Sequence, residues 1–351
     1  MSTLIEIDGR KVGAGQPPFI IAELSGNHQQ SYDTAIAMID AAAAAGAHAI
    51  KLQTYTADSM TLDVEAGEFV ISEADSLWQG EALYRLYQKA ATPYEWHEGL
   101  FKRARDSGML AFSSPFDSEA VDFLESLEVP CYKVASFENT DLPLIRRIAR
   151  TGKPIIMSTG MASLSELQES VTAAREAGCK DLILLKCTSA YPSPAEDIHL
   201  ASLADLRQRF GCPVGLSDHT TGVEIALAAT ALGAAVIEKH FVLSRAAGGV
   251  DAAFSLEPAE LELLVQQSQR VFAALGTVNY GQTESDRTAR FYRRSIYVSR
   301  NIKAGEAAST DNIKIVRPGL GLAPKYFEQI LGKIARQDLA KGTPVSWEVF
   351  E

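Results

Sequence analysis

Cysteine is scarce in this sequence, and no two cysteines form a CxxC pair. The four that are present, at positions 131, 179, 187 and 212, are scattered, and three of them lie in or beside apolar runs. Disulfide frameworks and zinc sites show paired cysteine spacings, whereas isolated cysteines in apolar surroundings are typical of buried thiols in a reducing compartment. We therefore expect a cytoplasmic protein.

The sequence also has fewer basic than acidic residues and lacks long apolar segments. The chain has 33 Lys and Arg against 44 Asp and Glu, with a net charge of −11 and a pI of about 5.2. A nucleic acid or an anionic membrane needs a basic face to displace its counterions, so we expect neither as a partner. The first residues contain no apolar signal, and Asp40 and Gly46 bound the alanine run 41–45, so no membrane span or export signal is expected.

The GxGxxG turn of dinucleotide-binding sheets is absent after the first strand, and a long alternation of two patterns is present instead. Short apolar runs, typical of strands buried on both faces, span 19–24, 49–54, 109–114, 131–136, 154–159, 181–187, 213–218 and 235–240. Stretches with helical spacing span 31–45, 93–107, 117–127, 141–151, 163–177, 199–209, 222–232 and 258–274. Strands separated by helices run parallel, so this pattern predicts a closed (β/α)8 TIM barrel in preference to a doubly wound open sheet.

Residues typical of helix starts support this division into strands and helices. The predicted helix starts carry capping residues or a first-turn proline, namely Ser31, Ser118, Asp141, Ser163 and Pro258. The stretch 55–92 is the least regular, and we interpret it as an elaborated loop over the barrel mouth.

The pattern changes after position 275. Residues 276–292 are polar and suit a linker, and residues 293–351 contain short strand-like runs separated by glycine turns. NIKAGEAAS (301–309) resembles DLAKGTPVS (338–346), which indicates a small β-rich module of two related halves. We therefore predict a catalytic barrel over 1–275, a linker and a small C-terminal domain.

Every predicted strand ends in polar residues, and barrel enzymes carry their chemistry at these carboxyl ends. The last two strands end in the sequences SDH and EKH, which place His219 beside His240, and barrel closure brings Glu23 of the first strand to the same corner. Two imidazoles and a carboxylate with open positions suit a divalent metal. A single histidine there would more often be a hydrogen-bonded rim residue, but two on adjacent strands favour the metal.

Lysines and serines at the other strand ends indicate an anion pocket. Lys51, Lys133, Ser136, Ser158 and Ser217 converge on the mouth, where they suit a small anion with phosphate or carboxylate groups. A desolvated Lys133 or Lys186 also suits a Schiff base, and the residues alone leave that alternative open. Arg317 lies in a Gly/Pro-rich loop, where it suits either a substrate contact or an ordinary surface position.

The motifs IAELSGNH, LQTYTADSMTL, SSPFD, YKVAS, STGM, KCTSAYPSP, GLSDHT, EKHF and RPGLG together resemble the sialic acid synthase family from end to end. Within the family, SGNH, TYTADSMTLD and GGVDAAFSLEP are most similar to the pseudaminic branch. Ser189 stands where the neuraminate branch carries an asparagine. The C-terminal module resembles the family's antifreeze-like SAF domain.

The resemblance implies condensation of phosphoenolpyruvate with an open-chain 2,4-diacetamido-2,4,6-trideoxyaltrose, with release of phosphate. It implies a divalent metal (Mn, Mg or Co) on His219 and His240, Glu23 beside the attacking water, and a homodimer that exchanges its SAF domains. The implied substrate-binding residues are Lys51, Gln53, Ser114, Lys133, Ser136, Ser158, Ser189, Tyr191, Ser217 and Asp251, with Arg317 from the partner subunit.

Three alternatives remain at this stage. A neuraminate or legionaminate synthase would use the same mechanism with another amino sugar. A Schiff-base aldolase would need no metal and release no phosphate, and a non-catalytic sugar-binding protein would have no use for both histidines and the lysines.

Overall fold

The computed structural model describes residues 4–72, 76–281 and 283–351, which form two compact units divided between Gly276 and Thr277. Each unit has its own buried hydrophobic cluster. The finer boundaries of the linker, 276–292, stay a prediction. No helix among the described residues is long and apolar enough to cross a membrane.

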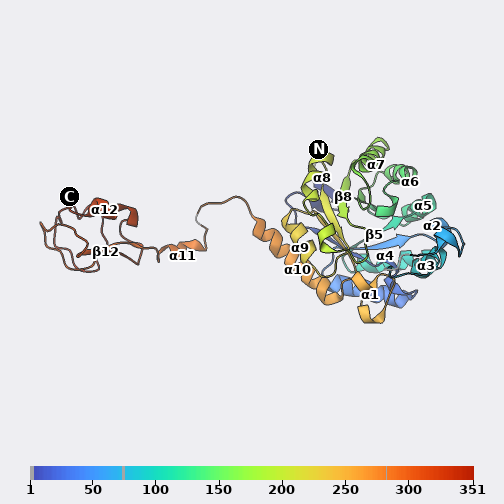
Figure 1. Ribbon diagram of the computed structural model, residues 1–351, viewed down its shortest axis with the longest axis horizontal. Helices are drawn as coiled ribbons and strands as arrows, with labels where there is room; N and C mark the ends of the chain where they lie inside the picture. Colours follow the sequence, from blue (N-terminus) through green and yellow to red (C-terminus); the bar gives the residue numbers. More distant parts are fainter. Residues whose placement is uncertain (1–3, 73–75, 282) are drawn as a thin grey trace. The chain divides into compact units, whose positions relative to one another are not determined.

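The first unit is built on a closed barrel of parallel strands, which confirms the predicted fold class (Figure 1). The strands follow one another around the barrel in chain order, and the last pairs with the first. They are β3 (Phe19–Glu23), β4 (Ala49–Thr54), β5 (Leu110–Pro115), β6 (Tyr132–Val134), β7 (Ile155–Ser158), β8 (Leu182–Cys187), β9 (Val214–Asp218) and β10 (Val236–His240).

A ring of helices covers the barrel, so each strand is buried on both its faces (Figure 1). This explains why the strands are short apolar runs without polar alternation. The covering helices are α1 (Tyr32–Ala44), α4 (His97–Asp106), α5 (Ser118–Ser126), α6 (Leu142–Ala149), α7 (Leu164–Glu176), α8 (Ser202–Phe210), α9 (Glu224–Ala231) and α10 (Pro258–Leu275).

Most of the predicted helix starts are confirmed. Ser31 and Asp141 accept hydrogen bonds from the backbone three residues on, and Ser163 forms a capping box with Glu166. Pro258 opens α10. The prediction for Ser118 was wrong: Asp117, one residue earlier, caps α5, and Ser118 is the first helical residue.

The long connection between β4 and α4 contains the short helices α2 (Ala57–Met60) and α3 (Leu83–Ala90). An antiparallel bridge joins Val70 to Ala82 within it. Single 3-10 turns lie here and in other connections, as η1 (Ser25–His28), η2 (Gly67–Phe69), η3 (Tyr94–Trp96), η4 (Ser136–Glu138), η5 (Ala195–Asp197), η6 (Arg245–Ala247) and η7 (Ala252–Phe254).

An N-terminal hairpin precedes the barrel and was not predicted. Its strands β1 (Leu4–Ile7) and β2 (Arg10–Gly13) pair antiparallel, and Asp8 and Gly9 form the turn with φ of 46° and 77°. An Asp-Gly turn with both φ values positive is the two-residue connection that matches the twist of a hairpin.

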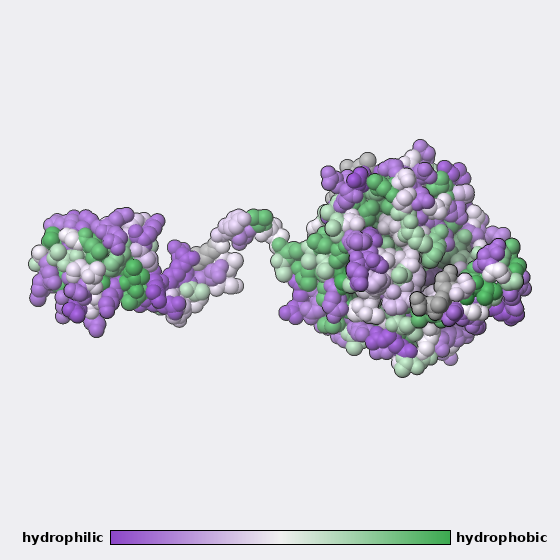
Figure 2. Space-filling model, viewed as in Figure 1, coloured by the Kyte–Doolittle hydropathy of each residue, from purple (hydrophilic) through white to green (hydrophobic). Residues whose placement is uncertain are grey.

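The second unit is small and has few regular elements. It contains α11 (Asp286–Arg290), β11 (Ser295–Val298), β12 (Ile313–Val316), η8 (Pro324–Tyr326) and α12 (Phe327–Ile330). The two related segments noted in the sequence pair with each other, because Ile302 and Leu339 exchange backbone hydrogen bonds of 2.9 and 2.8 Å. Figure 2 shows hydrophobic residues between hydrophilic ones on its surface.

Candidate active site

The carboxyl ends of the strands bring the predicted catalytic residues together. His240 at the end of β10 lies opposite Glu23 at the end of β3, and Glu23 lies opposite Lys51 on β4. On the other side of β10, Glu238 lies opposite Ser217 on β9. Since side chains alternate along a strand, Glu238 and His240 share one face.

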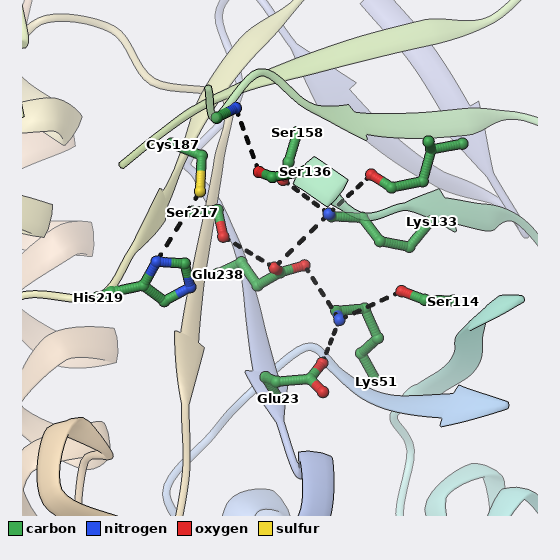
Figure 3. A network of polar contacts seen from close by, with 12 residues as sticks. Glu23, Lys51, Ser114, Lys133, Ser136, Ser158, Cys187, Ser217, His219 and Glu238 are labelled. Carbon is green, nitrogen blue, oxygen red and sulfur yellow. Dashed lines mark hydrogen bonds and ion pairs between the residues drawn. The ribbon is translucent and has the colours of Figure 1, made fainter. Parts of the chain in front are cut away.

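Two lysines and two glutamates form a buried charge network inside the mouth (Figure 3). Lys51 forms an ion pair with Glu23, and its Nζ lies 4.0 Å from Glu238 Oε2. Lys133 Nζ lies 3.9 Å from Glu238 Oε1. All four side chains are at most 5% exposed. The two positive charges are therefore balanced locally by two negative ones.

Burial and the charges of the network act together on the pKa values of Lys51, Lys133 and Glu238. Burial alone would lower the pKa of Lys51, but Glu23 and Glu238 outweigh it and raise this pKa. Burial dominates at Lys133 and lowers its pKa. Burial would raise the pKa of Glu238, but Lys133 and Lys51 lower it. Glu238 therefore stays ionised between the two lysines.

Hydroxyl groups surround this network. Lys133 Nζ donates to Ser158 Oγ at 2.7 Å, Lys51 Nζ donates to Ser114 Oγ at 3.4 Å, and Ser217 Oγ donates to Glu238 at 3.0 Å. These serines thus lie within hydrogen-bond distance of the charges, as the anion-pocket hypothesis requires.

Gly160, just after β7, leaves room for two further hydroxyls. Its N–H donates to Ser136 Oγ at 3.2 Å. A Cβ at this position would meet Ser189 Oγ and, at 2.6 Å, Ser136 Oγ. Ser189 Oγ is buried, and the Tyr191 hydroxyl is near enough to interact with it. The three residues form a small polar cradle.

The two predicted metal ligands lie side by side, with ring centroids 5.2 Å apart. His219 Nδ1 lies 2.9 Å from Thr188 O, which can only accept, so Nδ1 carries a proton, and in the neutral ring Nε2 is the nitrogen with the free lone pair. Cys187 Sγ lies 3.9 Å from the same Nδ1 (Figure 3). Burial would raise the pKa of Cys187, but His219 outweighs it and lowers this pKa to about 7.

His240 has a carboxylate beside it rather than a backbone oxygen. Its Nδ1 lies 3.5 Å from Asp251 Oδ2 and otherwise lacks a partner among the described residues. Burial would raise the pKa of Asp251, but His240 outweighs it and lowers this pKa. An acceptor at Nδ1 directs the Nε2 lone pair of a histidine toward a metal.

The two imidazoles suit a divalent ion with open positions, and a carboxylate lies beside them. Glu23 is engaged by Lys51, so the carboxylate next to the imidazoles is Asp251. The described residues contain no cluster of three His, Cys, Asp or Glu side chains suited to a metal. The two imidazoles would hold the ion, with the other positions left to water or substrate, as catalytic sites commonly have it.

Aromatic rings line the side of the histidines. The Tyr191 ring centroid lies 4.5 Å from that of His219, and Phe254 lies 4.9 Å from His240. Trp78 in the β4–α4 connection lies 6.2 Å from Tyr191, and its indole N–H donates to Val250 O at 3.1 Å. The loop after β10 therefore meets the long connection over the mouth.

The remaining predicted residues are not members of this charge network. Gln53 is half-buried on the same face of β4 as Lys51. Arg317 belongs to the second unit, where it is exposed. Lys186 Nζ donates to Cys187 O at 3.0 Å, and Lys239 pairs with Asp218 at 3.1 Å. Asp218 and Lys239 directly follow Ser217 and Glu238 on their strands, so their side chains point to the opposite face.

Sequence reasoning gave no role to Glu238, Ser25 and Cys187, although the structure places all three within the site. Glu238 had a signal, because it lies two residues before His240 on one strand and therefore on the same face. Ser25 and Cys187 contact Asp251 and His219 through side-chain geometry that no spacing in the sequence reveals.

Comparison with known proteins follows the same division of the chain. A model of the NeuB family matches residues 38–280, more than half of the sequence, and a model of the SAF domain matches residues 293–351. The chain belongs to the NeuB family.

Relatives of this NeuB-family member span nearly its whole length. A Helicobacter pylori protein named pseudaminic acid synthase is 45% identical over 340 residues, covering 96% of this chain and 98% of the relative. A Campylobacter jejuni protein of the same name is 45% identical and covers 92% and 94%. A Leptospira borgpetersenii N-acetylneuraminic acid synthetase, solved with citrate, superposes with a TM-score of 0.73 at 32% identity, covering 82% of this chain and 95% of that one.

Proposed function

We propose that this NeuB-family enzyme condenses phosphoenolpyruvate with 2,4-diacetamido-2,4,6-trideoxy-β-L-altropyranose, in its open-chain form, and water to give pseudaminic acid and phosphate. The observation that supports an anionic substrate is the pair of buried lysines, Lys51 and Lys133, which donate hydrogen bonds to serine hydroxyls. The choice of sugar rests on relatives at 44–45% identity that are named pseudaminic acid synthase, against 33–35% for those named N,N'-diacetyllegionaminic acid synthase.

Phosphoenolpyruvate would occupy the polar side of the mouth. Lys51 and Lys133 supply positive charge, and Ser136, Ser158 and Ser217 supply hydroxyl donors, with Gln53, Ser114 and Ser189 at the margin. An incoming phosphate would compete with Glu238 for both lysines. Preorganised cations in a water-poor site stabilise charge that develops on the enol phosphate during the reaction.

His219 and His240 would hold a divalent ion such as Mn²⁺, Mg²⁺ or Co²⁺. When bound, such an ion polarises the aldehyde oxygen of the sugar. The protein holds both imidazoles in one tautomer through Thr188 O and Asp251. Tyr191 and Asp251 border the same space and would bind the sugar.

Bond formation between C3 of phosphoenolpyruvate and the aldehyde carbon leaves oxocarbenium character at C2. Water adds to C2, and phosphate then departs by C–O cleavage. Glu23, fixed against Lys51, would orient this water and accept its proton. A Glu23→Gln enzyme that turns over at the normal rate would remove this role.

A second copy of the chain would complete the sugar site. The residues from Thr277 onward carry a net charge of +4 and the rest of the chain −15, so the SAF unit of one subunit and the barrel of another attract each other. Exposed apolar side chains, including Leu320 at 65%, support such a contact. In this homodimer the partner would contribute Arg317.

The enzyme would work in the cytoplasm, because its four cysteines are buried and unpaired. The testing assay is phosphate release from phosphoenolpyruvate with Mn²⁺, comparing the diacetamido-trideoxyaltrose with N-acetylmannosamine and including an EDTA control. Release with the first sugar alone is expected. Release with N-acetylmannosamine alone would assign the enzyme to the neuraminate branch, and release with neither would refute the assignment.

A further inference from the structure

Ser25, just after β3, contacts two carboxylates of the site at once. Its backbone N–H donates to Glu23 Oε1 at 3.1 Å, and its hydroxyl donates to Asp251 Oδ2. Ser25 is 1% exposed, and Glu23 is fully buried. One residue therefore joins the carboxylate at the end of β3 to the one that stands beside His240.

The backbone of Ser25 is in a conformation that favours glycine. Its φ is 42°, in the left-handed region where a Cβ approaches the carbonyl oxygen. Strain of this kind persists where the surrounding structure imposes it, and it gathers at functional sites. The next residue, Gly26, cannot carry a side chain, because a Cβ there would lie 2.9 Å from Ala90 Cα. The backbone of Ala90 therefore packs closely against this turn.

The loop that carries Asp251 has other anchors for its backbone. Asn27 Nδ2 donates to Phe241 O and Ser255 Oγ, each at 2.9 Å, and Asn27 Oδ1 accepts from Asp251 N at 3.1 Å. The backbone of the loop is thus held by Asn27. The carboxylate of Asp251 has Ser25 Oγ as its hydrogen-bonding partner and His240 Nδ1 at 3.5 Å.

We propose that Ser25 is a positioning residue, kept in a strained conformation so that its hydroxyl holds the Asp251 carboxylate beside His240 and in fixed relation to Glu23. The kinetic part of this inference rests on the proposed function, in which Asp251 borders the sugar and His240 holds the metal. Ser25 would act through Asp251 and not by contact with substrate or metal.

The variant Ser25→Gly separates this role from a merely structural one, because it relieves the strain and removes the hydroxyl. We expect the melting temperature to fall by no more than a few degrees, because relief of the backbone strain offsets part of the lost hydrogen bond. We expect kcat/KM for the sugar to fall about 10- to 100-fold, the range for a lost hydrogen bond to a charged group. KM for phosphoenolpyruvate should stay within about 3-fold, since Lys51 and Lys133 are untouched.

Glu128→Gly is the matched control. Glu128 also has a positive φ, 56°, and lies in the turn before β6 at the opposite end of the barrel. This variant relieves the same kind of backbone strain without removing a contact of the site, so it should keep its melting temperature and its sugar kinetics. Unchanged sugar kinetics in Ser25→Gly would overturn the proposal, and so would a melting temperature far below that of the wild type together with a raised KM for phosphoenolpyruvate.

A crystal structure of Ser25→Gly gives a readout that needs no turnover. The Asp251 carboxylate should leave its position beside His240 while the Asn27 hydrogen bonds persist. An unmoved carboxylate would refute the positioning role even if the wild type proved inactive, an outcome that would refute the proposed function separately.

Discussion

Replacing Glu238 with glutamine removes one of the two negative charges that balance Lys51 and Lys133. The side chain keeps its size, so the change tests electrostatics rather than packing. After it, Lys133 has no carboxylate within 4.0 Å among the described residues, although Ser158 Oγ and Val134 O still accept its hydrogen bonds.

The expected loss follows from leaving a buried charge unpaired. Breaking a buried pair costs about 3 to 5 kcal/mol, and the remaining hydrogen bonds of Lys133 favour the lower figure. At roughly 2 to 4 °C per kcal/mol, the melting temperature should fall by about 6 to 12 °C. Since Lys133 can lose its proton, and burial already lowers its pKa, the deficit should shrink as pH rises from 7 to 9.

Differential scanning fluorimetry with and without phosphoenolpyruvate, in EDTA, checks this prediction. The substrate anion would replace the missing charge, so it should stabilise Glu238→Gln more than the wild type. Glu125→Gln is the control, because Glu125 pairs with Lys153 at 2.6 Å where both side chains are about a third exposed, and it should cost under about 1 kcal/mol. Equal losses in the two variants, or an equal response to the substrate, would refute the charge-network argument.

Two other perturbations follow from the structure. Burial lowers the pKa of both His28 and His97 to about 4, and because the unfolded chain binds more protons below about pH 6.5, stability should fall between pH 6.5 and 4. At pH 5 the two histidines together lower the free energy of unfolding by roughly 4 kcal/mol, which urea unfolding at pH 7 and pH 5 can measure. The His97→Gln variant should lose less stability between these two pH values, and an unchanged loss would contradict the assignment. Gly160→Ala places a Cβ between Ser136 and Ser189, so KM for phosphoenolpyruvate should rise at least about 10-fold while sugar KM stays constant; the reverse pattern would place the anion elsewhere.

The barrel could be predicted because its strands are buried on both faces. Covered strands leave uninterrupted apolar runs such as Ile155–Ser158, and the helices between them leave a distinct spacing. The predicted N-cap of α5 was wrong by one residue, because Asp117 and Ser118 are neighbours and both residue types can cap a helix. The N-terminal hairpin carried a usable signal in Asp8-Gly9 that was not used.

The site could be predicted as a neighbourhood but not as a set of contacts. Strand order places Glu23 between β10 and β4, which makes both His240 and Lys51 its neighbours. Which neighbour it contacts depends on side-chain rotamers and local charge, and the structure gives Lys51. Asp251 supplies the carboxylate beside His240, but it lies on a loop. Residue spacing in the sequence does not predict the path of a loop.

The most direct test of the proposed chemistry uses phosphoenolpyruvate labelled with ¹⁸O in the bridging C2–O bond. The account predicts metal-dependent phosphate release in the presence of the diacetamido-trideoxyaltrose, with the label retained in the phosphate, because C–O cleavage leaves the bridging oxygen on phosphorus. Unlabelled phosphate, with the label in the nine-carbon product, would show P–O cleavage and contradict the water attack assigned to Glu23.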